Sequence, residues 1–160
     1  MNYELVLADY SNEQHGKDIG FLMGCYASDA MGGSKPLTEN IRTSLASALA
    51  KVPQAFSLLF YVNNKPAGLV NCIEGFSTFN CKPLMNIHDV VVAPDFRGKG
   101  ISTLMLSKVE EISVEKGCCK VTLEVLEGNH IAQNSYKKSG FSDYVLDPEM
   151  GRALFWQKML

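Results

Sequence analysis

The chain has 160 residues, a length typical of one domain and sufficient to bury a sizeable core. Hydrophobic residues make up 46% of it and charged residues 20%, as in ordinary globular proteins. Its 15 Lys and Arg residues are balanced by 17 Asp and Glu residues, so it lacks the basic field that general nucleic-acid binding requires. We therefore expect a single domain over residues 1–160 and no nucleic-acid partner.

The sequence gives no signal for export or for a membrane partner. The first residues, MNYELVLADYSNEQHGKD, lack a basic segment followed by a long apolar one. The longest apolar runs, such as Phe56–Val62, are too short to span a bilayer. The five cysteines show no CxxC or Cys/His spacing, so we expect reduced, mostly buried thiols and no metal site. Together these features favour a cytoplasmic protein.

The first third of the chain predicts one strand followed by two helices. An alternating pattern predicts the strand at Tyr3–Ala8. Ser11 or Asn12 can cap the first helix, which must end before the loop Met31–Pro36 because that loop is rich in glycine and proline. Thr38 then opens the second helix.

Three antiparallel strands are expected next. Apolar and β-branched runs predict them at Phe56–Val62, Ala67–Phe79 and Leu84–Val92, with turn-forming residues between them. The third strand then passes into a helix with an apolar face through Phe96–Gly100, a short basic turn with two glycines. Such a turn leaves backbone N–H groups unpaired at the positive end of a helix dipole, which suits phosphate. Taken alone, the two glycines are equally compatible with a purely conformational role.

The remaining chain predicts a parallel crossover and a closing strand pair. A strand is expected at Cys119–Leu126, parallel to the one before the basic turn. A short helix follows at Asn129–Lys138, and two more strands are expected at Phe141–Val145 and Ala153–Met159. The resulting order is β-α-α-β-β-β-α-β-α-β-β, without an internal repeat.

This order and two motifs resemble the GNAT superfamily of acyl-CoA-dependent N-acyltransferases. Val90–Pro94 followed by Arg97–Ser102 is similar to the family's R-x-x-G-x-G/A pyrophosphate loop, except that Ser102 holds the last position. The run from Asn129 to Phe141 resembles the family motif N-x-x-A-x-x-x-Y-x-x-x-G-F. The resemblance implies an α/β (α+β) fold with four helices, a parallel strand–helix–strand crossover, and a mixed, mostly antiparallel sheet of about seven strands.

The resemblance also implies an acetyl-CoA site. The pyrophosphate would lie on the N–H groups of the basic loop, and the pantetheine arm would pair like an extra strand with the end of the preceding strand. The implied cofactor contacts are Val90, Val91, Val92, Arg97, Gly98, Lys99, Gly100, Ile101, Ser102, Thr103, Asn129 and Tyr136.

Amine acetylation calls for an acid and a base. Tyr136 matches the family position whose hydroxyl lies near the sulfur, so the resemblance implies a general acid; the alternative is a core aromatic side chain. Asp89 is our candidate base, although a water chain can serve instead. His88 precedes it, and neighbours on a strand point to opposite faces, so we expect at most one of the two to face the cleft.

For the acceptor amine, the resemblance points to the first two helices with their loop and to the later strands. The candidate substrate contacts are Asp29, Met31, Glu74, Phe79, His88 and Glu124. Alternatively, these residues serve only turn geometry, packing and solvation.

The expected function is therefore an acetyl-CoA-dependent N-acetyltransferase acting on a primary amine of a small molecule, peptide or protein, by direct attack in a ternary complex. The alternative is a non-catalytic acyl-CoA-binding or regulatory module with the same fold. Apolar residues in the last expected strands permit a homodimer.

Overall fold

The computed structural model describes residues 2–160. Besides three single-turn 3-10 helices, its elements are β1 (Tyr3–Leu7), α1 (Glu13–Ser28), α2 (Glu39–Leu49), β2 (Ala55–Val62), β3 (Lys65–Ser77), β4 (Lys82–Val92), α3 (Ile101–Glu115), β5 (Val121–Leu123) and α4 (His130–Lys138). The single turns are Ala30–Gly32, Pro94–Phe96 and Pro148–Met150. Four α-helices were expected, and four are formed within this range. None of the helices in residues 2–160 has the length and apolar character needed to cross a bilayer.

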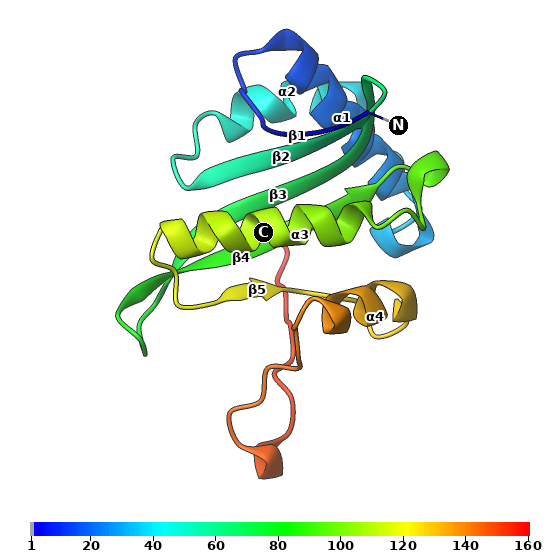
Figure 1. The fold of residues 1–160 in the computed structure, drawn as a ribbon. Coiled ribbons are helices and arrows are strands. Elements are labelled where there is room, and N and C mark those ends of the chain that lie inside the picture. The colour runs from blue at the N-terminus through cyan, green and yellow to red at the C-terminus, as the bar shows by residue number, and fades with distance from the viewer. Residues whose placement is uncertain (1) are drawn as a thin grey trace.

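The strands form one sheet in the order β1-β2-β3-β4-β5 (Figure 1). Neighbouring strands are antiparallel except for β4 and β5, which are parallel and joined by α3. A parallel pair needs such a crossover, because a tight turn can join only antiparallel strands. The expected parallel crossover is therefore confirmed.

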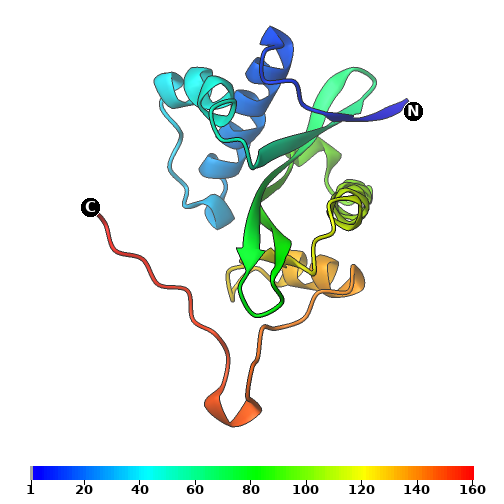
Figure 2. The same cartoon turned by 90° about the vertical axis from the view of Figure 1, so that its left-hand side faces the viewer.

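Helices cover both faces of the sheet. α1 and α2 lie on one face and α3 on the other, as Figure 2 shows edge-on. Successive residues of β2 serve the two layers: Leu58 packs in the cluster that contains Met105 of α3, and Leu59 packs in the cluster that contains Ile19 of α1. This alternation follows from the two-residue period of a strand, and it makes the middle of the sheet a fully buried layer.

Local capping fixes where the first helices begin. The side chain of Asn12 accepts hydrogen bonds from the N–H groups of Gln14 and His15, so Asn12 and not Ser11 caps α1. Thr38 caps α2 by accepting from the Ile41 N–H. Both caps satisfy amide groups that a helix start otherwise leaves unpaired.

The expectation of about seven strands is wrong for residues 2–160, because the sheet there has five. The two expected closing strands, Phe141–Val145 and Ala153–Met159, are not formed. One long backbone hydrogen bond, from Ala153 N to Tyr144 O at 3.4 Å, joins these arms. They extend away from the sheet (Figures 1 and 2), and an isolated strand pair without a sheet to pack on is marginal in water.

Candidate active site

The basic loop leads from the end of β4 into α3. Gly98 and Gly100 have φ of 74° and 77°, in the left-handed region that favours glycine. In the described part of the chain, a Cβ added at either glycine would meet no atom within 4 Å. The two glycines therefore serve the conformation of the loop, and the space over the loop is open.

The start of α3 presents free backbone donors to that open space. Gly100 is the N-cap residue, and within residues 2–160 no side chain caps this helix. The first-turn N–H groups thus lie at the positive end of the helix dipole without a capping acceptor, as an anion site requires. The hydroxyls of Ser102 and Ser135, 3.3 Å apart, tie this end of α3 to α4.

Two basic side chains flank the loop. Arg97 donates from Nε to the Val92 carbonyl oxygen at 3.1 Å, and its NH2 lies 3.0 Å from the Asp29 carboxylate. Lys99 donates to the Asp95 carbonyl oxygen at 3.0 Å. The Arg97 side chain is half-exposed in its ion pair, and exposed pairs are weak, so it can turn to a more highly charged anion.

Asp29 directly follows α1, and its carboxylate reaches Arg97 of the basic loop. Its carboxylate accepts from the Met31 N–H at 2.9 Å, and this bond, together with Arg97, lowers the pKa of Asp29. The structure therefore brings two candidate substrate residues, Asp29 and Met31, beside the candidate cofactor residue Arg97.

A gap opens in the sheet next to the loop. β5 pairs with β4 only where Val121–Leu123 faces Met85–Ile87, whereas β4 continues to Val92. The backbone of β4 over residues 88–92 thus has no β5 partner in the described chain. Val90 and Val92, candidate contacts for the pantetheine arm, lie on this open stretch.

A β-bulge re-aims the side chains at the start of the gap. Asn71 of β3 faces Asp89, but Cys72 faces Ile87, so His88 is an extra residue in β4. A bulge breaks the strict alternation on which the expected opposite orientation of His88 and Asp89 was based. His88 is exposed, whereas Asp89 is half-buried and hydrogen-bonded.

Asp89 lies at the end of a chain of hydrogen-bonded polar side chains. The chain runs from Tyr10 through β2 and β3 to Asp89 of β4. The Asn71 amide donates to Asp89 Oδ2 at 3.0 Å, and Ser57 Oγ donates to Asn71 Oδ1 at 2.6 Å. Tyr10 Oη lies 2.9 Å from Ser57 Oγ. Since the Ser57 proton is directed to Asn71, Tyr10 is the donor in that contact, and every donor in the chain points toward the Asp89 carboxylate.

Two tyrosines, Tyr26 and Tyr136, have raised pKa values. Burial raises the pKa of Tyr26, at the end of α1, and the charges of Asp89 and Asp29 raise it further. Burial, with a smaller contribution from Tyr26, raises the pKa of Tyr136 to about 12. The Tyr136 ring packs against Phe141 in a T-shaped contact with centroids 6.0 Å apart. Tyr26 thus interacts electrostatically with both Asp89 and Tyr136, while the Tyr136 ring packs in the cluster that includes Val90 and Val92.

The remaining candidates lie apart from this group. Glu74 forms an ion pair with Lys116 at 2.9 Å, and Phe79 is 85% exposed at the tip of the β3–β4 hairpin, the end of β4 opposite to the loop. Glu124 follows β5 and is exposed. Asn129 uses its side-chain oxygen to cap α4 by accepting from the Ala132 N–H at 3.1 Å, which leaves its amide nitrogen for a ligand.

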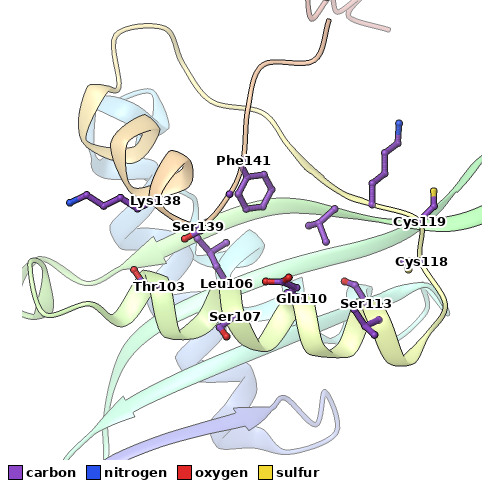
Figure 3. A pocket seen from close by; sticks show the side chains of 14 residues that line it. Thr103, Leu106, Ser107, Glu110, Ser113, Cys118, Cys119, Lys138, Ser139 and Phe141 are labelled. Atoms are coloured by element: carbon purple, nitrogen blue, oxygen red, sulfur yellow. The ribbon is translucent and has the colours of Figure 1, made fainter. Parts of the chain in front are cut away.

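A hollow lies elsewhere, between α3, β5 and the residues after α4 (Figure 3). Its volume is about 570 Å³, and Thr103 is the one candidate cofactor residue in its lining. Among the residues that the structure describes, no three His, Cys, Asp or Glu side chains are grouped so that they could hold a metal ion.

Sequence reasoning missed Asn71, Ser57 and Tyr26. The first two are polar residues inside otherwise apolar strands, and a buried polar side chain requires a partner. That was a usable signal for Asn71 and Ser57. Tyr26 carried no such signal, because a tyrosine on an apolar helix face is ordinary.

The chain belongs to the GNAT acetyltransferase family, because the family model described as "Acetyltransferase (GNAT) family" matches residues 17–141. An uncharacterized N-acetyltransferase of Methanocaldococcus jannaschii is 37% identical over 83 residues, which are 51% of this chain and 37% of that protein. A thialysine N-epsilon-acetyltransferase of Mus musculus is 42% identical over 57 residues, 36% of this chain and 34% of that protein. The chain thus matches about a third of the length of these relatives.

A solved structure supports the fold over the whole chain. An aminoglycoside N-acetyltransferase in complex with CoA is 15% identical and superposes with a TM-score of 0.74, over 99% of this chain and 96% of that one. The resemblance derived from the two sequence motifs is confirmed at the level of family and fold.

Proposed function

We propose that the protein is an acetyl-CoA-dependent N-acetyltransferase that transfers an acetyl group to a primary amine, with residues 1–160 acting as one catalytic domain in the cytoplasm. The observation that carries the proposal is the loop after β4. It combines an uncapped helix start, open space over two left-handed glycines, and the basic residues Arg97 and Lys99. This loop adjoins the end of β4 that has no β5 partner. These features match, in order, a diphosphate and an extended amide-containing arm.

Acetyl-CoA, when bound, supplies an acetyl group activated as a thioester. In our proposal the N–H groups from Arg97 to Thr103 bind its diphosphate, and Arg97 leaves Asp29 to add charge. The N–H groups of Val90 and Val92 and the C=O group of Val90, which have no β5 partner, bind the arm as a neighbouring strand would, and the Asn129 amide supports it. Val91 is 3% exposed and packs in the core, so it acts only through its backbone.

The chemical steps fall to Asp89 and Tyr136. Asp89 accepts a proton from the incoming ammonium group, directly or through water, which leaves a neutral amine able to attack. The Asn71–Ser57–Tyr10 chain supports this role, because the hydrogen bond from Asn71 holds the Asp89 carboxylate in a fixed position. Tyr136 donates its hydroxyl proton to the departing sulfur. Its raised pKa keeps that proton available at neutral pH.

The acceptor is a primary amine of a small molecule or of a peptide or protein. The names of the relatives support amines as a class, since one acts on thialysine and another on aminoglycosides. Asp29 and Met31 lie near the loop and are the better-placed candidates for amine contacts; Glu74 and Phe79 lie at the far end of β4.

A CoA-release assay tests the function. Incubation with acetyl-CoA and a panel of polyamines, aminoglycosides, amino acids and peptides is expected to release free thiol with at least one amine. In the Arg97→Ala variant we expect KM for acetyl-CoA to rise about tenfold with a smaller change in kcat, since a charge-assisted phosphate contact is lost. Lys116→Ala, which breaks a distant surface ion pair, should leave both constants unchanged. Tight binding of acetyl-CoA without thiol release across the panel would instead favour the non-catalytic module.

A charge placed beside Asp89 tests its role as the base. Asn71→Asp puts a second carboxylate where the Asn71 amide now lies 3.0 Å from Asp89 Oδ2. Two carboxyl groups at such a short distance do not both ionise readily. The active form of the enzyme, with Asp89 deprotonated, should therefore require a higher pH. We expect the acidic limb of the kcat/KM profile to move up by about 1–2 pH units.

Asn80→Asp is the matched control for that experiment. It adds the same charge at an exposed hairpin residue, away from Asp89, and should leave the profile in place. An Asn71→Asp enzyme whose acidic limb coincides with that of the wild type would remove Asp89 from the base role.

A further inference from the structure

The ion pair between Asp29 and Arg97 joins two segments that lie far apart in the chain. Asp29 directly follows α1, and Arg97 lies 68 positions later, in the basic loop before α3. The Arg97 Nη2 atom lies 3.0 Å from the Asp29 carboxylate, and its Nε atom donates to the Val92 carbonyl oxygen at 3.1 Å. The guanidinium group to which our proposed function assigns a diphosphate is therefore bound by a carboxylate of the same chain.

The loop after α1 holds the Asp29 carboxylate in place. Its Oδ1 atom accepts from the Met31 N–H at 2.9 Å, and its Oδ2 atom accepts from Arg97. The backbone carbonyl oxygen of Asp29 accepts from the N–H groups of Gly32 at 2.9 Å and Ser34 at 3.0 Å. These bonds fix both the side chain and the main chain of Asp29, so its carboxylate loses little further freedom when Arg97 binds it.

The same loop packs tightly against the end of α1. The Lys35 N–H donates to the Ala27 carbonyl oxygen at 3.0 Å. A Cβ added at Gly32 would lie 1.9 Å from the carbonyl oxygen of Tyr26, so only glycine allows the loop to approach the helix this closely. A loop closed on α1 in this way keeps the Asp29 carboxylate within reach of the guanidinium group, even when that group turns to another anion.

A phosphate and Asp29 require the same nitrogen of Arg97. A guanidinium group binds a phosphate through two parallel N–H bonds, either from Nε and Nη2 or from Nη1 and Nη2. Nη2 belongs to both pairs, and it is the atom that lies 3.0 Å from the Asp29 carboxylate. Two anions on one guanidinium group also repel each other. The diphosphate and Asp29 therefore compete for Arg97.

We propose that Asp29 is an internal competitor of the cofactor diphosphate, and that it binds Arg97 again as CoA leaves and so speeds release of this product. The inference rests on the proposed function, which assigns the diphosphate to Arg97. A competitor in the chain lowers the fraction of molecules in which Arg97 is free, and the apparent affinity for the diphosphate falls by the same factor. The Arg97 side chain is 51% exposed, and exposed ion pairs change an equilibrium constant by a few-fold at most.

The competition acts on the product as well as on the substrate. Acetyl-CoA and CoA carry the same diphosphate, so Asp29 weakens the binding of both alike. Differences in affinity between variants of one site lie mostly in the dissociation rate, so the contact shortens the residence time of CoA. Release of product limits turnover in many enzymes, and in such an enzyme the Asp29 contact raises kcat.

Asp29→Asn tests the competition, because it removes the charge and keeps an oxygen that can accept from the Met31 N–H. We expect the Kd for CoA, measured by isothermal titration calorimetry, to fall about threefold. Stopped-flow displacement of bound CoA should show dissociation slowed by a similar factor. CoA is the only ligand in these measurements, so contacts between Asp29 and an amine do not enter.

Asp95→Asn is the matched control. It removes the same charge from an exposed residue two positions before Arg97, and it should change the Kd for CoA by less than half as much. An equal gain in affinity from Asp95→Asn would attribute the effect to charge alone and overturn the competition.

A double-mutant cycle separates the contact from the general effect of charge. In the Arg97→Ala background, Asp29→Asn has no guanidinium group to release and should leave the Kd for CoA unchanged. If Arg97→Ala weakens CoA binding but Asp29→Asn does not strengthen it, or strengthens it equally with and without Arg97, the competition alone is overturned. An Arg97→Ala variant that binds CoA as tightly as the wild type would instead place the diphosphate elsewhere, and the proposed role of the basic loop would fail together with the competition.

Discussion

Replacing Tyr136 with phenylalanine is expected to lower kcat by about 100-fold at saturating acetyl-CoA and amine, the usual worth of a positioned general acid. Only the hydroxyl is removed, so the ring keeps its T-shaped contact with Phe141 and the fold should be unaffected. KM for both substrates should change little, because the proton is transferred only as the thioester breaks. Steady-state kinetics with both substrates varied provides the measurement.

The raised pKa of Tyr136 gives this prediction a second test. A tyrosine is an effective acid only while protonated, and burial keeps this one protonated until the pH approaches about 12. Activity of the wild type should therefore show no loss from Tyr136 ionisation up to about pH 10, where an unperturbed tyrosine is half ionised. Tyr144→Phe removes the hydroxyl of a half-exposed tyrosine in the extended end of the chain and serves as the control. If Tyr136→Phe turned over as fast as this control, the hydroxyl would have no part in the reaction.

The features that the sequence predicted well are those that depend on neighbouring residues. Asn12 caps α1 because its own oxygen reaches amides two and three residues later. Gly98 and Gly100 were expected to shape a loop at a helix start, and both have positive φ. Caps, turns and periodicity are local, so one sequence is enough to indicate them.

The contacts that organise the candidate site are not local, and the sequence did not predict them. The Arg97–Asp29 pair joins residues 68 positions apart, and Asn71 reaches Asp89 across 18 positions. The bulge at His88 is a property of the pairing between β3 and β4, and neither strand alone encodes it in its pattern. Such contacts follow only once the strands are in register.

The extended end of the chain, residues 142–160, shows the same limit in the fold. Its alternating apolar residues predicted a strand, and its backbone is indeed extended, but a strand exists only where another supplies hydrogen-bond partners. The propensity of Ala153–Met159 for a strand is a local property of the sequence, whereas the pairing partner that a strand needs is not. The error in strand number therefore came from assigning strands by propensity where the sheet of residues 2–160 supplies no pairing partner.

Gly20→Ala is expected to lower the free energy of unfolding by about 3 kcal/mol, the upper range for overpacking a buried contact. Gly20 is buried where α1 crosses α2, and a Cβ there would lie 2.3 Å from the carbonyl oxygen of Arg42. That oxygen belongs to the backbone and cannot rotate away, so the two helices have to separate. Urea denaturation followed by circular dichroism measures the change.

Gly16→Ala is the matched control in the same helix, one turn earlier. Its added Cβ would lie 3.4 Å from the Ala46 Cβ, an ordinary van der Waals contact. Alanine favours a helix over glycine by up to about 1 kcal/mol, so this variant should be more stable than the wild type. Two identical substitutions in one helix thus have opposite expected signs, and stabilisation by both would contradict the close α1–α2 contact. Separating α1 from α2 should also displace residues of the candidate site, because Tyr26 lies in the last turn of α1 and Asp29 follows the helix. We therefore expect Gly20→Ala to weaken acetyl-CoA binding at temperatures where the variant is still folded.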